Sequence, residues 1–366
     1  MKSKELTDKV EERSPEEVES ERLKRKKKAR RRKTWRIIDR IFGFFLATGI
    51  VCGLAGLGLE YVLIKGPSPA LRDTFVATML ETRRFRFIPN IFLTEEEVQA
   101  IENSRVVHVD GAQDLSLITL PSEDSLAGNG ADAYGVIDED GDGIILENIM
   151  GPGYVGYLIT VLDPTRCFVG MPNGYGGTGL TLGEMCEKYD ALGGINAGGF
   201  VDPDGGGLGG LPQGLTIIDG VCYNQGYGGE AFAGFDDKGV LHIGYYTLED
   251  TQNLNIVSGV SFGPILIYNG ESTITGGESE GVQPRTAIGQ RGDGAILMLV
   301  IDGRQVHSIG AKNTDVINIM LDHGAVNAIN MDGGSSTTMW YEGDYVNKCS
   351  SANGLARPLP NAFLFK

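Results

Sequence analysis

Three short segments of this chain place polar side chains beside glycines, directly after β-rich runs. They are residues 194–200 (GINAGGF), 283–288 (QPRTAI) and 329–339 (INMDGGSSTTM). Paired glycines at a strand end bring backbone N–H groups close to a ligand, because no Cβ stands in the way. Asp332 is followed by two glycines and four hydroxyl residues, which predicts an anion-binding nest beside a carboxylate. Arg285 adds a planar fork of donors that suits a phosphate or a carboxylate.

Each segment alone also fits a structural role. Asn and Gly are common in turns, and a single arginine often pairs with a structural carboxylate. An Asp followed by Gly and Ser is also typical of an aspartic-protease loop, but that class needs two copies and this chain has one imperfect copy. The four histidines have no ligand spacing, so we expect no histidine-based triad and no histidine metal site.

Taken together, the segments resemble the phosphodiester glycosidase family, over about residues 110–366. The resemblance rests on four stretches in this order: INAGGF at 195–200, PRTAIG at 284–289, MDGGSSTTM at 331–339 and RPLPNA at 357–362. The chain departs from the family at two points. It has NAGGF where the family often has NGGFF, and Ala356 where many members carry an acidic residue. The second departure leaves any second catalytic carboxylate unassigned.

The resemblance implies hydrolysis of a sugar C1–O–phosphate bond without a cofactor. The leaving group is a weakly basic phosphate monoester, so stabilising its charge matters more than protonating it. We therefore expect Asp332 to activate water or to support the oxocarbenium-like carbon, while Arg285 and Arg357 clamp the phosphate. The residues expected to bind the substrate are Asn196, Gly198, Gly199, Thr286, Gly333, Gly334, Ser335, Ser336, Thr337 and Asn361.

A separate acidic loop carries Asp138, Asp140 and Asp142 before Gly143, as in the first half of a calcium-binding loop. Position twelve of such a loop is Ile149 instead of Glu, which excludes an EF-hand. Two alternatives stay open. One is a looser extracellular site with structural calcium, which could serve a calcium-dependent surface interaction module, and the other is a solvated acidic turn.

The N-terminal region predicts on which side of a membrane these motifs lie. Residues 1–40 contain 16 Lys and Arg against 9 Asp and Glu, whereas the remainder contains 16 against 39. Residues 41–59 have no charged side chain and, extended by residues 61–64, are long enough to cross a bilayer as a helix. The basic cluster at 24–33 should stay in the cytoplasm, which places the acidic C-terminal part outside.

The same segment has other interpretations. A buried core helix and a cleaved signal peptide are the alternatives, but the run is long and begins deep in the chain. The basic cluster also resembles a nucleic-acid-binding patch, yet the acidic remainder favours a topology signal, so no nucleic-acid partner is expected. Gly49 and Gly53 form a GxxxG spacing that would allow a homodimer through the span.

Four regions follow from these patterns: a cytoplasmic basic tail (1–36), a transmembrane helix (37–64), a helical juxtamembrane stalk (65–105) and a phosphodiester glycosidase-like domain (106–366). The domain is expected to be α+β, with a mixed or antiparallel sheet and few helices. Strands are predicted at 157–162, 215–218, 240–246, 264–268 and 295–301. Asp219-Gly220, Asp293-Gly294 and Asp302-Gly303 are predicted to be hairpin turns.

Helix signals are fewer. A capping box begins at Thr181 for a helix to about Tyr189, and another begins at Thr94. Thr314 should open a helix over 315–323 that Gly324 stops. Cys167, Cys186, Cys222 and Cys349 lie beyond the span, so either up to two disulfides or free thiols fit.

The sequence therefore predicts a single-pass cell-membrane protein with an extracytoplasmic hydrolase domain. Its substrate would be a carbohydrate phosphodiester in a surface glycan or exopolysaccharide. The rival hypothesis is a non-catalytic module that binds glycan phosphodiesters during envelope or exopolysaccharide assembly. Ala356 favours the rival, whereas Asp332 and Arg285 favour hydrolysis.

Overall fold

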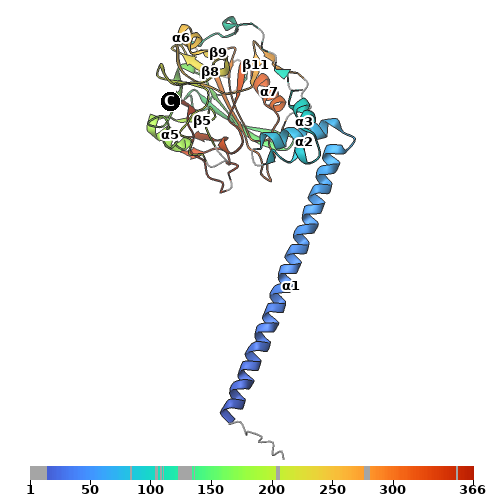
Figure 1. Ribbon diagram of the computed structural model, residues 1–366. Helices are drawn as coiled ribbons and strands as arrows, with labels where there is room; N and C mark the ends of the chain where they lie inside the picture. Colours follow the sequence, from blue (N-terminus) through green and yellow to red (C-terminus); the bar gives the residue numbers. More distant parts are fainter. Residues whose placement is uncertain are drawn as a thin grey trace, which may run out of the picture. The chain divides into compact units, whose positions relative to one another are not determined.

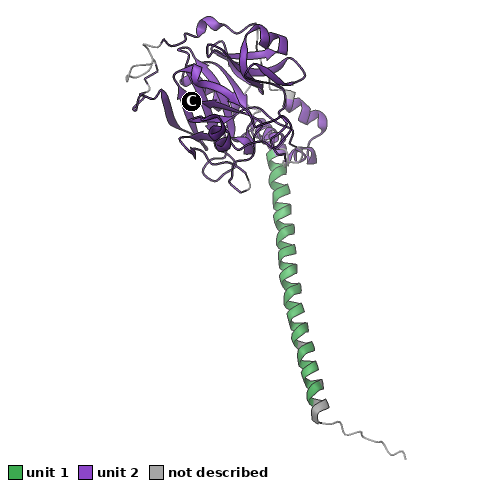
Figure 2. Ribbon diagram, turned by 90° about the vertical axis from the view of Figure 1, so that its left-hand side faces the viewer, with its two compact units in different colours: residues 1–63 green, residues 64–366 purple. Residues whose placement is uncertain are grey.

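The computed structural model describes residues 15–366, except 83–84, 104–105, 108, 110, 123–133, 136, 203–206, 276–280 and 352. It divides into two compact units, Met1–Leu63 and Ile64–Lys366, which Figure 2 colours separately. The domain boundaries at 36, 64 and 105 expected from the sequence stay predictions.

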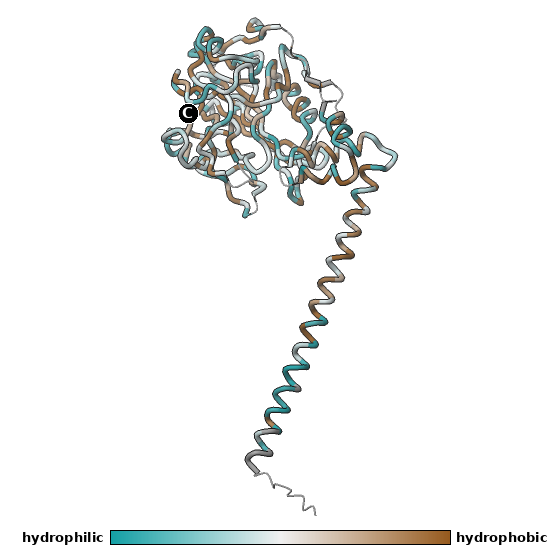
Figure 3. The backbone as a smooth tube through the Cα atoms, in the orientation of Figure 1, coloured by the Kyte–Doolittle hydropathy of each residue, from teal (hydrophilic) through white to brown (hydrophobic). Residues whose placement is uncertain are grey.

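The first unit consists mainly of helix α1 (Pro15–Lys65). Figure 3 shows that its N-terminal part is hydrophilic and that apolar residues dominate further along the helix. The helix is long and apolar enough to cross a membrane, by length and composition. The expected N-terminal apolar helix is therefore present, and its composition also suits a signal sequence.

The second unit is built on antiparallel sheets, which confirms the α+β expectation (Figure 1). The largest sheet has the strand order β12 (Glu271–Ser272), β11 (Ile265–Tyr268), β16 (Ala325–Met331), β14 (Arg285–Arg291), β15 (Ile296–Ile301), β3 (Tyr154–Val161) and β2 (Ile144–Gly151). A second has the order β18 (Asp344–Tyr345), β17 (Met339–Tyr341), β5 (Gly193–Asn196), β19 (Ala362–Phe365) and β4 (Cys167–Gly170). A third has the order β7 (Val221–Gln225), β6 (Leu215–Ile218), β10 (Ile256–Ser261), β8 (Glu230–Asp236) and β9 (Leu241–Tyr246). β1 (Val106–Val107) pairs separately with β13 (Ile274–Thr275).

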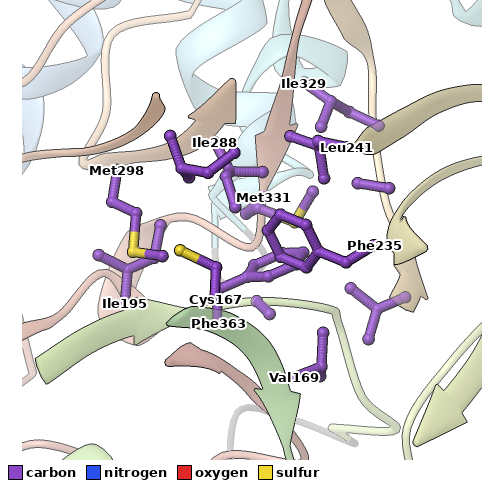
Figure 4. Close-up of a cluster of buried hydrophobic side chains, with 14 of the residues drawn as sticks. Cys167, Val169, Ile195, Phe235, Leu241, Ile288, Met298, Ile329, Met331 and Phe363 are labelled. Atoms are coloured by element: carbon purple, nitrogen blue, oxygen red, sulfur yellow. The ribbon is translucent and has the colours of Figure 1, made fainter. Parts of the chain in front are cut away.

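One hydrophobic core joins these three sheets. Figure 4 shows Met298 and Ile329 of the largest sheet, Ile195 and Phe363 of the second, and Phe235 of the third in a single cluster. All five side chains are almost completely buried. Burial of large apolar side chains from every sheet holds the strand ends in fixed relative positions.

The central strands of the largest sheet are buried on both faces, which explains the continuous apolar run at β15. Side chains alternate along this strand: Met298 faces the three-sheet core, whereas Leu297 and Leu299 face helix α7 (Asn313–Asp322). Val316 of α7 packs in that second cluster and is fully buried. A strand with both faces covered loses the apolar–polar alternation of a half-exposed strand.

The helix predictions are largely confirmed. α5 (Leu182–Tyr189) has the Thr181 capping box, and α3 (Glu95–Asn103) begins after Thr94, whose N–H donates to Glu97 Oε2 at 2.8 Å. α7 begins at Asn313, two residues before the predicted start, because the backbone N–H of Lys312 donates to Asp315. The sequence missed α6 (Leu248–Asn253), which has its own capping box at Thr247.

Helix α2 (Pro69–Glu81) belongs to the second unit. Val76 packs with Leu93, Val98 and Ile101 in a small cluster of its own. Short 3₁₀ turns occur at Pro89–Ile91, Leu115–Leu117, Pro164–Arg166 and Gly334–Ser336.

Two of the three predicted hairpin turns are correct. Asp219-Gly220 joins β6 to β7 with both residues at positive φ, and Asp293-Gly294 lies between β14 and β15. Asp302-Gly303 is not a hairpin turn. The Asp302 carboxylate is completely buried and accepts hydrogen bonds from Asn347 Nδ2 (3.0 Å) and the Lys348 N–H (3.2 Å). It therefore ties together two loops, 302–308 and 347–350.

The cysteine alternatives are also resolved. All five cysteines lie within the described residues and are free thiols. Burial raises the pKa of the Cys186 thiol to about 12, and it also raises the pKa of the Cys167 thiol. Both thiols therefore stay protonated at neutral pH and serve as small packing groups.

Candidate active site

Strand register brings the predicted motifs to one edge of the largest sheet. β14 pairs antiparallel with β16, and Thr286 lies opposite Met331, so Arg285 and Asp332 leave the sheet at the same edge. β15 also ends there, because Ile301 lies opposite Arg285. The start of one strand and the ends of its two neighbours therefore meet.

Asn196, at the end of β5, holds the backbone at this edge through side-chain hydrogen bonds. Its Nδ2 donates to the Asp332 carbonyl at 2.6 Å, and its Oδ1 accepts from Thr286 Oγ1 at 2.8 Å and from the Thr338 N–H at 3.0 Å. The Asp332 N–H in turn donates to the Ala197 carbonyl at 3.0 Å. Asn196 is fully buried, so its side chain fixes the backbone of Asp332 instead of lining a cavity.

A cavity of about 900 Å³ lies in front of this edge. Among the described residues, its charged lining side chains are Glu81, Asp202, Arg285, Arg304, Asp332 and Arg357. Hydroxyl groups line it from Thr82, Ser335, Ser336, Ser350 and Ser351, and aromatic rings from Phe85, Phe200 and Phe262. The wall thus combines three guanidinium groups with three carboxylates and apolar rings, a composition that can hold both a phosphate and a sugar.

Arg285 lies in the wall, as expected, but much of its guanidinium is already engaged. Its Nε donates to the Ala311 carbonyl at 3.0 Å, and its Nη2 donates to the Gly281 carbonyl at 2.6 Å and to Glu81 Oε2 at 3.2 Å. The side chain is only 4% exposed. A buried guanidinium needs such partners, so Arg285 supplies fixed positive charge more readily than free donors.

Arg304, which the sequence analysis did not select, lies over the glycine turn. A Cβ added to Gly334 would lie 3.1 Å from Arg304 Nη1, so the guanidinium covers this glycine directly. Arg304 Nη2 donates to two neutral oxygens, Thr82 Oγ1 at 3.3 Å and Gln283 Oε1 at 3.2 Å. Burial lowers the pKa of Arg304, Glu81 raises it, and the neighbouring Arg285 lowers it further.

The backbone of Arg304 adopts an uncommon conformation. Its φ of +57° lies in the left-handed region, which is uncommon for a residue other than glycine. Such strain costs of order 1–3 kcal/mol and persists where the surrounding structure enforces it, often at functional sites.

Arg357 approaches the same turn from the C-terminal segment. Its Nη1 donates to Ser335 Oγ at 3.2 Å, and its Nη2 pairs with Asp202 Oδ2 at 2.8 Å. Its guanidinium also lies over the Phe200 ring, 4.6 Å from the centroid. These contacts fix the guanidinium of Arg357, which the sequence predicted as a site residue, beside the hydroxyl residues.

The predicted binding residues fall into two groups. Those that line the cavity are Gly199, Gly333, Gly334, Ser335 and Ser336. Those that the structure places behind its wall are Asn196, Gly198, Thr286, Thr337 and Asn361. Asn361 illustrates the second group: it is fully buried, and its Oδ1 accepts from the Gly198 N–H at 2.7 Å.

Three charged residues of the wall were missed by the sequence analysis: Glu81, Asp202 and Arg304. Arg304 follows a β-rich run, the same signal that selected the other motifs, but the preceding Asp-Gly suggested a hairpin turn. Asp202 lies two residues after the NAGGF stretch and offered a similar signal. Glu81 offered none, since it lies 204 residues before its partner Arg285.

The acidic loop does bring its three carboxylates together. Asp138, Asp140 and Asp142 each have a carboxylate oxygen within 4.8 Å of the others. Asp138 is buried, and its two oxygens accept from the N–H groups of Gly141 and Gly143, both at 2.9 Å. Calcium at this loop stays a prediction.

Comparisons with known proteins relate the C-terminal region of the chain to one family. Residues 189–366 match the profile of the phosphodiester glycosidase family. The chain is 30% identical over 201 residues to the SPbeta prophage-derived uncharacterized protein YomE of Bacillus subtilis. The aligned region covers 52% of this chain and 29% of that protein. The chain thus spans less than a third of the length of this relative.

Two solved structures match parts of this chain, and the first of them supports the fold. One is the catalytic domain of zebrafish N-acetylglucosamine-1-phosphodiester alpha-N-acetylglucosaminidase, auto-inhibited by its pro-peptide. It has 23% identity and a TM-score of 0.52, over 61% of this chain and 81% of that one. The other is a hypothetical protein from Synechocystis, with 15% identity and a TM-score of 0.49, over 61% of this chain and 62% of that one.

The fold resembles that of the zebrafish catalytic domain, and the arginine-lined cavity lies within the same region of the chain. The match to the phosphodiester glycosidase family lies in the C-terminal region, residues 189–366, which contains Arg285, Arg304, Asp332 and Arg357.

Proposed function

We propose that this protein hydrolyses the C1–O bond of sugar-1-phosphodiesters, releasing a free sugar and a phosphate monoester. The observation that carries the proposal is the meeting of Asp332 with Arg285, Arg304 and Arg357 around one cavity. A carboxylate beside several guanidinium groups suits a reaction in which the leaving group carries negative charge.

The residues take distinct roles in this proposal. Arg304 and Arg357 contact the non-bridging phosphate oxygens above the turn that contains Gly334 and Ser335, while Arg285 adds buried positive charge. Asp332 removes a proton from the attacking water or stabilises the positive charge that develops at C1. Water supplies the hydroxyl at C1, and the C1–O electron pair leaves with the phosphate.

The setting of the reaction is also part of the proposal. Helix α1 is apolar enough to act as a membrane anchor, and its basic flank favours a cytoplasmic N-terminus. The domain would then act outside the membrane, on phosphodiester-linked surface glycans or exopolysaccharide. This placement restricts the substrate to extracytoplasmic glycans.

A substrate panel tests the proposal. The full-length protein, purified in detergent, is incubated with sugar-1-phosphodiesters that differ in sugar and anomer, and free reducing sugar is measured. We expect release from at least one member of the panel. We expect none from the control, a simple alkyl glycoside of the same sugar that has no phosphate. Clear binding without release across the panel would contradict hydrolysis and would instead support the glycan-binding accessory module.

A further inference from the structure

The C-terminal end of helix α2 contributes a negative charge to the arginine cluster. Glu81 Oε2 lies 3.2 Å from Arg285 Nη2, and the Glu81 side chain is only 18% exposed. Burial lowers the pKa of Arg304, and the Glu81 carboxylate partly offsets this lowering, so its charge lies within electrostatic reach of both arginines. Glu81 therefore pairs with Arg285, and its charge also acts on Arg304, which we propose as a phosphate contact.

The position of Glu81 is fixed by close packing. Thr78 Oγ1, one turn earlier in α2, accepts from the Val282 N–H at 3.0 Å. A Cβ added to Gly281 would lie 2.5 Å from Glu81 Oε2, so only glycine permits this approach. Thr82, the next residue, accepts from Arg304 Nη2. Two consecutive residues at the end of α2 thus contact both arginines.

This carboxylate changes which anions the arginines favour. Arginine clusters normally bind a doubly charged phosphate monoester more tightly than a singly charged diester, because each extra charge adds Coulomb attraction. A fixed carboxylate nearby repels the monoester about twice as strongly as the diester. The carboxylate therefore weakens the preference of the arginines for the dianion. The N–H donors of the arginines can still bind the monoanion.

We propose that Glu81 is a specificity-determining residue that makes this site select phosphodiester monoanions over phosphomonoester dianions. The inference rests on the proposed function, because the dianion is then the product of the reaction. Repulsion by Glu81 would limit product inhibition and would keep terminal phosphomonoesters out of the site. α2 lies outside the region matched to the family, so this property belongs to the N-terminal part of this chain.

A matched pair of ligands tests the proposal without requiring turnover. Methyl phosphate is a dianion at pH 8, whereas dimethyl phosphate is a monoanion with almost the same shape. Their dissociation constants are measured by calorimetry on the full-length protein in detergent. For the unmodified protein we expect the two constants to agree within about threefold. A preference of tenfold or more for methyl phosphate would overturn the proposal.

The variant Glu81→Gln keeps the shape of the side chain and removes its charge. We expect it to bind methyl phosphate about tenfold more tightly relative to dimethyl phosphate than the unmodified protein does. Glu96→Gln, an exposed change of equal charge in α3, should leave the ratio unchanged. Equal changes for both ligands in Glu81→Gln would overturn the proposal.

The ligand pair also separates this inference from the proposed function. Binding of both ligands with an unaltered ratio in Glu81→Gln contradicts the role of Glu81 and leaves the phosphate site intact. Failure of both ligands to bind even the unmodified protein contradicts the phosphate site itself, and the inference fails with it. Because the first measurement uses the unmodified protein, it stays decisive if Glu81→Gln does not fold.

Discussion

Two loops of this protein have similar composition but different surroundings: the turn after Asp332 and the loop from Asp138 to Gly143. Both combine Asp with Gly, and the sequence marked both as ligand sites. The Asp332 turn leaves the buried edge of the largest sheet and faces a cavity with three arginines. In the acidic loop, by contrast, carboxylate oxygens of Asp138 and Asp142 accept hydrogen bonds from N–H groups of the loop and of the following residue, Ile144.

The difference lies in which groups hold the polar atoms. At Asp332, distant residues such as Asn196 hold the backbone, so the carboxylate is presented by a rigid scaffold. In the acidic loop, hydrogen bonds over two to five residues shape the turn locally. Local bonds of this kind are typical of Asx turns and need no ligand. The acidic loop also has distant partners, because Tyr341 Oη donates to Asp142 Oδ2 at 3.3 Å and Arg166 donates to the Asp142 carbonyl, but its carboxylates are held mainly within the turn.

Replacement of Asp332 by Asn should produce the largest effect. We expect hydrolysis of a sugar-1-phosphodiester to fall about 10³-fold, because the amide cannot accept a proton from water. The unfolding temperature should stay unchanged, since the backbone bonds to Asn196 and Ala197 are retained. Initial rates and thermal unfolding measure the two quantities. Unchanged turnover would remove Asp332 from the mechanism.

Replacement of Arg304 by Gln should reduce turnover about 10²-fold, because one charged donor to the phosphate is lost. Arg304→Lys should recover only part of the loss, since lysine lacks the planar fork. Lys238→Gln, an exposed change of the same charge, serves as the control. Equal rates for Arg304→Gln and the control would show that Arg304 does not contact the reacting phosphate.

Replacement of Asn196 by Ala tests the scaffold itself. Three buried hydrogen bonds would be lost, and the Asp332 carbonyl and Thr286 hydroxyl would lose a partner. We expect a loss of about 2 kcal/mol in the free energy of unfolding, together with slower turnover. Chemical denaturation provides the measurement, with the exposed Asn353→Ala as control. A stability loss below that of the control variant would contradict the role of Asn196 as a support.

Replacement of Asp140 by Asn should have the smallest effect. Asp140 is exposed, and its bond to the Asp142 N–H is long, at 3.3 Å. We expect a stability change below about 0.5 kcal/mol and no shift of the unfolding temperature on adding millimolar calcium. Stabilisation of the unmodified protein by calcium, lost in Asp140→Asn, would instead support a calcium site and weaken the contrast between the two loops.

Local patterns predicted much of the fold. The Thr181 capping box and the strand 215–218 were located correctly because each depends on neighbours in the sequence. The Asp332 turn was found for the same reason. Glu81 was not, because its contact with Arg285 is created by tertiary packing over 204 residues. Asp302 was misjudged because an Asp-Gly pair does not reveal whether its carboxylate is exposed or buried.

The central claim is cleavage at the C1–O bond, and isotope labelling tests it most directly. The full-length protein hydrolyses a sugar-1-phosphodiester in ¹⁸O-enriched water, and mass spectrometry locates the label. The account predicts ¹⁸O in the C1 hydroxyl of the released sugar and none in the phosphate monoester. Label in the phosphate would show attack at phosphorus and would contradict a glycosidase mechanism.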